Sequence, residues 1–334
     1  MMIRKWLTVG IILLFVATGI IPAIAQDTEK SLSSPRGNWL YVGGSGPGNY
    51  TKIQDAIDDA GDGDTVFVYS GVYNEQLFVN KSINLLGENK STTIINGQEN
   101  GCIITLLADN NIITNFTIKN AGFNGNEDIA GIIVYSSSNQ ISATIITSDT
   151  ENAYGILLVN SSYNIITMNI IHNNYHSGIE VRGGQENSIT YNLLFNNSHG
   201  SLCFGYSTKN LISENKIQDN ICLMLLGSSD NVIVKNIFEN KAIALLLTDS
   251  GNNTIKQNNF IKEWNRVIFL FYNILCASEK GTPKNNWDGN YWYRQRILPK
   301  TIFNHLLLDN KRAGISIEID WHPAQEPYNI TRMT

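Results

Sequence analysis

Short apolar runs alternate with polar stretches along most of the chain. Between residues 131 and 260, phrases such as Gly131-Ile-Ile-Val and Gly155-Ile-Leu-Leu are separated by segments rich in Asn, Ser, Gly and Asp. Aliphatic and β-branched runs of this length, bounded by turn residues, are typical of β-strands rather than helices. The pattern predicts a chain built from many short strands.

One phrase, Asn-x-Ile-x-x-Asn-x-apolar, recurs among these runs at intervals of about 21–28 residues, which is a period found in solenoid repeats. A leucine-rich repeat has a similar period, but its Leu-x-x-Leu-x-Leu phrase is missing here. We therefore predict an all-β fold, a single-stranded right-handed parallel β-helix in which each coil pairs with the next. Copies of the phrase begin at Asn164, Asn187, Asn210, Asn231 and Asn253, and looser copies at Asn111 and Asn139.

The repeated asparagines have a structural interpretation. Asn tolerates the left-handed conformation of tight turns, and stacked Asn side chains can hydrogen-bond along a solenoid. We expect both columns to be structural ladders, formed by Asn164, Asn187, Asn210, Asn231, Asn253 and by Asn169, Asn192, Asn215, Asn236, Asn258.

The N-terminus has the features of an export signal. Arg4 and Lys5 precede an apolar run from Trp6 to Ile21, and Ala23-Ile-Ala25 follows as a cleavage site. We predict a signal peptide over 1–25 and a secreted or cell-surface protein. An uncleaved anchor is the alternative, although the run is shorter than the roughly 20 residues of a membrane span. No later run is long enough to span a membrane.

Residues 38–88 depart from the repeat. Ile53, Ala56, Ile57 and Ala60 form an apolar stripe at helical spacing behind a capping box at Thr51-Lys-Ile-Gln54, and alternating strand segments follow. A short helix of this kind suits the end of a solenoid, whose terminal units differ from the inner ones. We divide the chain into a signal peptide (1–25), a linker (26–37), an N-terminal cap and first coil (38–88), coils (89–277) and a C-terminal cap or tail (278–334).

Four segments carry a family resemblance. Residues 50–68, 71–75 and 81–87 resemble the entry segment of the pectin lyase-like superfamily, and 285–292 resemble the closing segment of its NosD-type members. The chain is more similar to NosD-type and other secreted archaeal β-helix repeat proteins than to the pectin methylesterases, and the resemblance covers nearly all of residues 38–334. The resemblance implies a pectin lyase-like solenoid but specifies activity only weakly, because one fold hosts many functions.

The outer face of the strands is where chemistry is expected. If Ile179 and Val181 point inward, Glu180 and Arg182 point outward. One carboxylate and one arginine make a poor active site, so we expect a solvated ion pair there. The outward columns are Ile133, Leu157, Glu180, Cys203, Met224, Leu246 and Tyr135, Val159, Arg182, Gly205, Leu226, Thr248.

An apolar stripe of this length normally marks a covered surface or an interface. We expect either the aromatic tail to fold back over it, or a protein or glycan partner to occupy it. The candidate ligand face comprises Glu180, Arg182 and Tyr135 with Trp287 and Trp292, whose default role is packing in the core or cap.

Histidines offer one candidate metal site. His176 and His199 lie 23 residues apart and should stack on adjacent coils, with His172 nearby. Imidazoles can share copper or zinc, and the NosD-type resemblance implies a link to copper-site maturation. Stacked histidines without metal remain the simpler interpretation. Cys203 and Cys222 fall two residues out of register, which predicts free thiols.

Function is best predicted as non-catalytic binding of polysaccharide, glycan or cell-envelope material, or a structural role. A net charge of −5 with only 16% charged residues argues against nucleic acid. No cofactor is required, with copper or calcium as open alternatives. A copper-accessory role is one rival function. The other is a polysaccharide lyase or hydrolase, although the pectin methylesterase phrases are missing, and it would draw on Glu127, Asp128, Asp149 and Glu151.

Glycosylation is expected at exposed turns of an exported protein. The sequons are Asn49, Asn80, Asn89, Asn115, Asn160, Asn196, Asn252 and Asn329.

Overall fold

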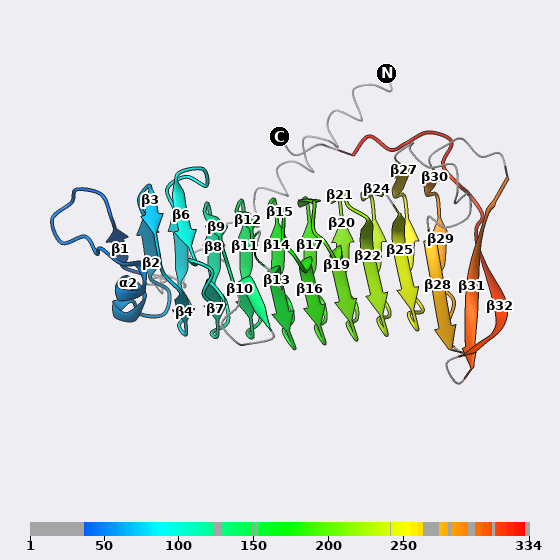
Figure 1. Cartoon of the computed structure of the whole chain (residues 1–334), viewed down its shortest axis with the longest axis horizontal. Helices are drawn as coiled ribbons and strands as arrows, with labels where there is room; N and C mark the ends of the chain where they lie inside the picture. The colour runs from blue at the N-terminus through cyan, green and yellow to red at the C-terminus, as the bar shows by residue number, and fades with distance from the viewer. Residues whose placement is uncertain are drawn as a thin grey trace, which may run out of the picture. The chain divides into compact units, whose positions relative to one another are not determined.

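The described strands form three sheets, and the chain passes through the sheets in turn from one coil to the next (Figure 1). The strands pair in parallel, except for one antiparallel pair at the C-terminal end. The computed structural model describes residues 37–122, 128–148, 150, 153–240, 242–262, 274–279, 282–292, 298–308 and 311–330. The predicted right-handed parallel β-helix is confirmed, with one short helix before the coils. The predicted signal peptide lies outside the described residues.

We name the sheets A, B and C. Sheet A contains β1 (Trp39–Val42), β2 (Thr65–Val68), β5 (Asn84–Gly87), β8 (Ile112–Thr114), β11 (Gln140–Ser142), β14 (Ile165–Thr167), β17 (Ser188–Thr190), β20 (Leu211–Ser213), β23 (Val232–Val234), β26 (Thr254–Lys256) and β29 (Asn286–Asp288). Sheet B contains β3 (Gly71–Tyr73), β6 (Thr93–Asn96), β9 (Thr117–Lys119), β12 (Ile145–Thr147), β15 (Ile170–His172), β18 (Leu193–Phe195), β21 (Lys216–Gln218), β24 (Ile237–Asn240), β27 (Asn259–Lys262) and β30 (Tyr291–Trp292). Sheet C contains β4 (Leu77–Val79), β7 (Ile104–Leu106), β10 (Ile129–Val134), β13 (Ala153–Val159), β16 (Ser177–Arg182), β19 (Gly200–Gly205), β22 (Ile221–Leu226), β25 (Ile243–Thr248), β28 (Ile274–Glu279), β31 (Lys300–Leu308) and β32 (Lys311–Asp320).

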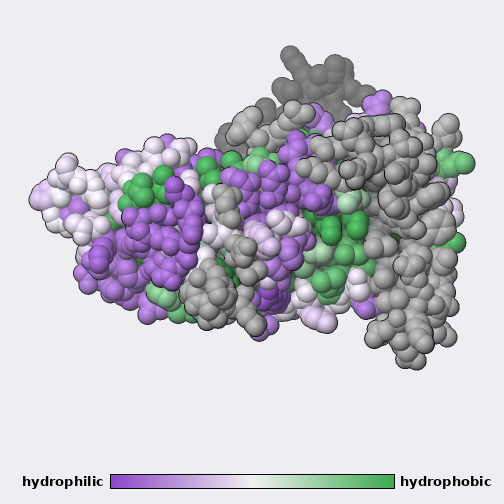
Figure 2. Space-filling view, in the orientation of Figure 1, coloured by the Kyte–Doolittle hydropathy of each residue, from purple (hydrophilic) through white to green (hydrophobic). Residues whose placement is uncertain are grey.

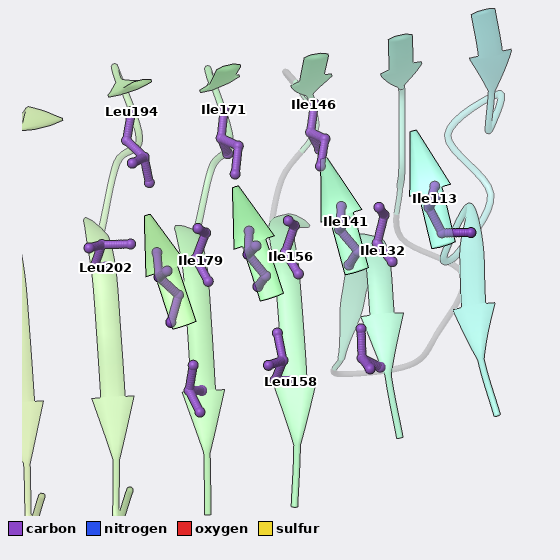
Figure 3. Close-up of a cluster of buried hydrophobic side chains, with 14 of the residues drawn as sticks. Ile113, Ile132, Ile141, Ile146, Ile156, Leu158, Ile171, Ile179, Leu194 and Leu202 are labelled. Carbon is purple, nitrogen blue, oxygen red and sulfur yellow. The ribbon is translucent and has the colours of Figure 1, made fainter. Parts of the chain in front are cut away.

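The core is a stack of aliphatic side chains. Figure 3 shows side chains from all three sheets pointing into one interior, among them Ile141 of sheet A, Ile171 of sheet B and Ile156 of sheet C. Their exposed fractions are 0–1%. Burying an aliphatic side chain contributes roughly 1.5–3 kcal/mol, so the inward positions of the strands, repeated in every coil, supply the main stabilising term.

Both predicted asparagine ladders are confirmed. The backbone N–H and side-chain Nδ2 of Asn164 donate to Asn187 Oδ1 at 2.9 and 3.0 Å, and this pattern repeats from coil to coil. The first ladder runs through Asn111, Asn139, Asn164, Asn187, Asn210, Asn231, Asn253 and Asn285. The second runs through Asn169, Asn192, Asn215, Asn236, Asn258 and Asn290.

Each ladder ends on a buried carboxylate of β32. Glu318 accepts the N–H of Asn285, and Asp320 accepts the N–H of Asn290 at 3.0 Å. An acceptor at this position satisfies the last buried donors of the stack. The ladder asparagines therefore serve as a continuous set of acceptors that ends where β32 closes the solenoid.

The expected left-handed conformation of the ladder asparagines is wrong. The residue before each ladder asparagine except Asn285 has the positive φ instead, as at Tyr163 (60°) before Asn164 and Met168 (57°) before Asn169. The turn bends one residue earlier, and the asparagine is needed because its Oδ1 accepts the buried N–H groups of the preceding coil.

The helix α2 (Ile53–Asp59) begins the solenoid, with Ile53, Ala56 and Ile57 buried as predicted. The predicted capping box is not formed. Glu75 instead accepts the N–H groups of Ile53 and Gln54 at 2.9 and 3.0 Å. A carboxylate at this end interacts favourably with the free N–H groups and the helix dipole.

The C-terminal tail does not cover the outward columns of sheet C, in the part of the tail that is described. Tyr328 exchanges hydrogen bonds with Asn259 of β27, and its hydroxyl donates to the Gly289 carbonyl at 2.7 Å. These contacts hold the tail beside sheets A and B, so the predicted cover over sheet C is wrong. No helix among the described residues is long and apolar enough to cross a membrane.

Candidate functional site on the outer face of sheet C

The predicted register of sheet C is confirmed. Leu157 pairs with Glu180 and Glu180 with Cys203, while Arg182 pairs with Val159 and Gly205. The intervening residues, such as Ile179 and Val181, are buried in the core. Glu180 and Arg182 therefore lie on the outer face, where side chains do not have to pack into the apolar core.

Arg182 is held by three side chains. Its Nε donates to Glu180 Oε1 at 2.6 Å and its Nη1 donates to Asp128 Oδ1 at 2.6 Å. Its Nη2 donates to the Tyr154 hydroxyl at 2.5 Å, and the guanidinium carbon lies 5.1 Å from the centre of the Tyr154 ring. We call Asp128, Tyr154, His176, Glu180 and Arg182 the arginine cluster.

The ion pair between Glu180 and Arg182 was predicted, but the expectation that it is solvated is wrong. Glu180 is only 9% exposed, and Ser177 Oγ donates to its second oxygen at 3.1 Å. Burial lowers the pKa of Arg182, and the hydrogen bonds to Glu180 and Asp128 outweigh this, so the pKa is raised overall. The guanidinium is fixed in place rather than free in solvent.

A histidine extends the cluster. The His176 ring packs 4.1 Å from the Tyr154 ring, centre to centre, and its Nε2 lies 3.3 Å from the Tyr154 hydroxyl. His199 stacks on His176 at 4.4 Å. Burial, and then the neighbouring His199, lower the pKa of His176, opposed by Glu180. His176 Nδ1 is buried, has no hydrogen-bond partner and lies 3.8 Å from Glu180.

The three candidate metal-binding histidines are not brought together. His176 and His199 stack as predicted, but His172 lies on β15 of sheet B and stacks on Phe195 at 4.8 Å. Within the described ranges, no group of three or more His, Cys, Asp or Glu side chains is placed to hold a metal ion.

Apolar surface flanks the arginine cluster along sheet C. On one side Ile133, Leu157 and Ala130 form a small buried cluster with Tyr154. On the other side a hydrophobic surface extends over β22 and β25 (Figure 2), and half-buried Met224, Leu226 and Leu246 lie in this part of the outward columns. Within the two outward columns from β10 to β25, the charged residues are Glu180 and Arg182 of β16.

The remaining candidates of the ligand face divide into two groups. Tyr135 is 49% exposed and lies in the same outward column as Arg182, two coils before it. Burial, and then the nearby Cys102 and Asp128, raise its pKa. Trp287 and Trp292 are 3% and 1% exposed, so their default role in core packing is confirmed and their candidacy as ligand residues is wrong. They continue the inward columns of Ile255 and Phe260 and donate their indole N–H to Glu318 and Asp320.

The sequence pattern did not identify the roles of Tyr154 and Asp128 in the arginine cluster. If side chains alternated regularly along β13, Leu157 would point outward and Tyr154 would point inward. The pairing skips Gly131 and Gly155, and a Cβ on Gly155 would meet the Gly178 carbonyl at 2.4 Å. The glycine shifts the alternation and turns Tyr154 outward with Leu157. Asp128 was singled out as one of four acidic residues; Glu127, Asp149 and Glu151 lie outside the described residues.

The cysteine prediction is confirmed for Cys203 and Cys222. Both are unpaired and buried, and burial raises the pKa of each thiol to about 12. All eight predicted sequons have an asparagine that is exposed or half-buried. Asn80, Asn89, Asn160, Asn196, Asn252 and Asn329 are the exposed ones.

Comparison with known proteins agrees with this architecture. Residues 130–273 match the family described as the right handed beta helix region. No curated protein sequence matches the chain. The chain is thus similar in sequence to right-handed β-helix proteins over these coils.

Solved structures with sugar-related descriptions are similar in fold. One is XylC in complex with xylose, with 12% identity, a TM-score of 0.58 and coverage of 83% of this chain and 73% of that one. A mutant of DFA-IIIase from Arthrobacter chlorophenolicus, in complex with DFA-III, has 15% identity, a TM-score of 0.59 and 76% coverage of both chains. The GH136 lacto-N-biosidase from Eubacterium ramulus has 11% identity, a TM-score of 0.54 and coverage of 75% and 60%. At these identities the likeness shows the fold alone.

Proposed function

We propose that this chain is a non-catalytic carbohydrate-binding β-helix that holds a glycan against the outer face of sheet C at the arginine cluster. The observation that carries the proposal is the fixed guanidinium of Arg182 on the same outer face as the half-exposed Tyr135, two coils away in the register. The proposal includes a secreted or cell-surface location and a polysaccharide or cell-envelope partner, which rest on the N-terminal sequence and the low charge.

The geometry of the arginine cluster suits recognition of a polyol. The Arg182 side chain is 35% exposed, and its contacts within the cluster use three of the five guanidinium N–H donors. A tyrosine ring presents an apolar face and a polar hydroxyl together. A sugar ring can stack on Tyr135 and accept hydrogen bonds from Arg182.

The same contacts argue against glycoside hydrolysis at this place. Hydrolysis requires one protonated carboxyl as acid and one carboxylate that acts as nucleophile or activates water. Asp128 and Glu180 both accept a hydrogen bond from Arg182, so one guanidinium engages both carboxylates. Two carboxylates that share one guanidinium are poorly suited to divide these roles.

The charge of the arginine cluster favours a neutral ligand. Two carboxylates face one guanidinium, so an acidic sugar meets more repulsion than attraction. The sugar-containing complexes among the similar folds, with xylose and with DFA-III, support a carbohydrate-related role at the level of fold. The copper-accessory alternative has no comparable support, because its histidines are not assembled.

The test is binding to a polysaccharide array by the purified full chain, read both as retained protein and as new reducing or unsaturated ends. We expect retention on neutral polysaccharides without product. Product formation would overturn the non-catalytic assignment and direct attention to the acidic residues near Asp128.

Two variants test whether the glycan binds at the outer face of sheet C. Arg182→Lys keeps the charge but loses the planar fork, and Tyr135→Ala removes the stacking ring. Each is expected to weaken binding by about tenfold, equal to about 1.4 kcal/mol. Tyr163→Ala is the matched control, because Tyr163 is 51% exposed and lies in the turn before β14. Unchanged binding by both cluster variants would exclude this face.

A further inference from the structure

A second group of unusual surface residues lies on the first two strands of sheet A. Trp39 and Tyr41 on β1 are 53% and 40% exposed, and Phe67 on β2 and Tyr69 directly after it are half-buried. Tyr41 pairs with Phe67 across the strands. We call these four residues the aromatic platform.

The four rings lie in mutual contact. The centres of the Trp39 and Tyr41 rings are 6.2 Å apart, as are those of Tyr41 and Tyr69, and both pairs are stacked with planes within 30° of each other. Phe67 lies 6.1 Å from Tyr41 and 5.1 Å from Tyr69 and meets both edge-on. Exposed aromatic rings gathered in this way are typical of a binding surface rather than of scattered surface residues.

The backbone beside the aromatic platform is shaped to hold it. Gly43 and Gly44 have φ values of 74° and 68°, and a Cβ on Gly44 would lie 2.9 Å from the Tyr69 ring. Asn49 Nδ2 donates to the Gly43 carbonyl at 2.6 Å, and the Tyr73 hydroxyl donates to the Tyr69 carbonyl at 2.9 Å. The loop therefore fixes Tyr69 before any ligand arrives, which lowers the entropic cost of binding.

Pairing with a second copy of the chain is not favoured at this edge. Tyr50 donates its N–H to the Tyr41 carbonyl and accepts the N–H of Gly43, both at 2.8 Å. These bonds occupy the C-terminal end of the outer edge of β1, where another strand would add. A ligand that rests on the face of the rings is unaffected by them.

Charge selects among ligands that could rest on the rings. Residues 37–92 contain seven acidic and three basic side chains, so an anionic lipid surface or an acidic polysaccharide is repelled. The phenol groups of Tyr41 and Tyr69 supply polar groups beside the apolar faces. The C–H faces of neutral sugars stack on aromatic rings while their hydroxyls bond to such groups.

We propose that Trp39, Tyr41, Phe67 and Tyr69 form a second binding site, which takes a neutral oligosaccharide of several sugar units. The site goes beyond the arginine cluster and does not depend on it. Together the two sites would let one rigid solenoid hold a glycan chain at two places.

The test uses the full chain with xylohexaose and cellohexaose as neutral probes and oligogalacturonate as the acidic one, measured by calorimetry. Trp39→Ala and Tyr41→Ala are each expected to weaken neutral binding by about tenfold, while Trp39→Phe, which retains a ring, stays within about threefold of the parent. Trp321→Ala is the matched control, because Trp321 is 62% exposed and lies in the tail. Folding of each variant is checked by its unfolding temperature.

Four outcomes overturn the proposal: no binding of either neutral probe, equal binding by parent and platform variants, preference for the acidic probe, or loss of self-association instead of sugar binding in Trp39→Ala. Failure here is separable from failure at the arginine cluster. Arg182→Lys leaves the Trp39-dependent binding intact if the platform is a site, whereas Trp39→Ala leaves the Arg182-dependent binding intact if the cluster is one.

Discussion

The asparagine ladders and the outer face of sheet C lie in the same coils and follow opposite rules. A ladder position such as Asn192 has an asparagine above and below it and is buried. A position on the outer face has a different neighbour in each coil, as Glu180 has Leu157 and Cys203. Inside, the chemistry of one coil dictates that of the next. On the outer face, the residue in one coil does not determine the residue in the next. A polar residue that differs from its column neighbours and is held by hydrogen bonds therefore marks a candidate site.

The largest expected effect is on a ladder. Asn192→Leu removes the acceptor for the Asn169 N–H and Nδ2, and it removes the donor to the Ile166 carbonyl. Buried unsatisfied groups cost about 1–3 kcal/mol each, so we expect a loss of at least about 3 kcal/mol in denaturant unfolding. Asn100→Leu, at an exposed turn, is the control and should change stability by less than about 0.5 kcal/mol. Equal effects would show that the ladder does not carry stability.

The next effect is on the outer face. Arg182→Met leaves Glu180 and Asp128 without their shared partner, and Glu180 is nearly buried. We expect a loss of about 2 kcal/mol at pH 7, below the cost of breaking a fully buried pair because Arg182 is partly exposed. The double variant Arg182→Met with Glu180→Gln should recover part of it. If it recovers nothing, the ion pair has no energetic role.

A smaller effect on stability is expected at Glu75, which caps the N-terminus of helix α2. Glu75→Gln weakens the charged acceptor that binds the N–H groups of Ile53 and Gln54. We expect a loss of about 1 kcal/mol, seen as earlier hydrogen exchange in α2 than in the coils. Thr51→Ala is the matched control, since the structure gives Thr51 no capping role, and it should leave exchange in α2 unchanged.

The smallest effect on stability is expected in a third, shorter ladder, where a carboxylate takes the place of an asparagine. Asn174 and Asn197 are followed by Asp219 instead of asparagine, and burial raises the pKa of Asp219 despite hydrogen bonds from Ser201 and Asn197. A carboxyl with a raised pKa in the folded state destabilises it as pH rises above the ordinary value of 3.8, and this cost vanishes below that value. Asp219→Asn should therefore raise the unfolding temperature at pH 7 and have no such benefit near pH 3. A uniform effect at both pH values would contradict this origin.

The features that repeat from coil to coil could be predicted from the sequence. The period predicted the solenoid, the ladders and the register of Glu180 with Cys203, because each coil must match its neighbours. It failed where contacts are specific to one place. Glu75 caps a helix more than 20 residues away, and Gly155 changes the phase of β13 and so turns Tyr154 outward.

Aromatic residues show a related limit. The aromatic character of Trp287 and Trp292 leaves both packing and sugar stacking open, but both residues continue inward columns and bond to the carboxylates that end the ladders. Trp39 and Tyr41 were overlooked because no repeat marks them. Whether an aromatic ring is buried depends on strand pairing at the two ends of the solenoid, where the repeat no longer applies.

The most direct test of the central claim is calorimetric titration of the parent chain and Arg182→Lys with the neutral glycan best retained on the array, followed by an assay of the same samples for reducing ends. The account predicts measurable binding by the parent, binding weaker by about tenfold in Arg182→Lys, and no new ends in either sample. Equal binding by the two proteins, or new ends in the parent sample, would contradict it.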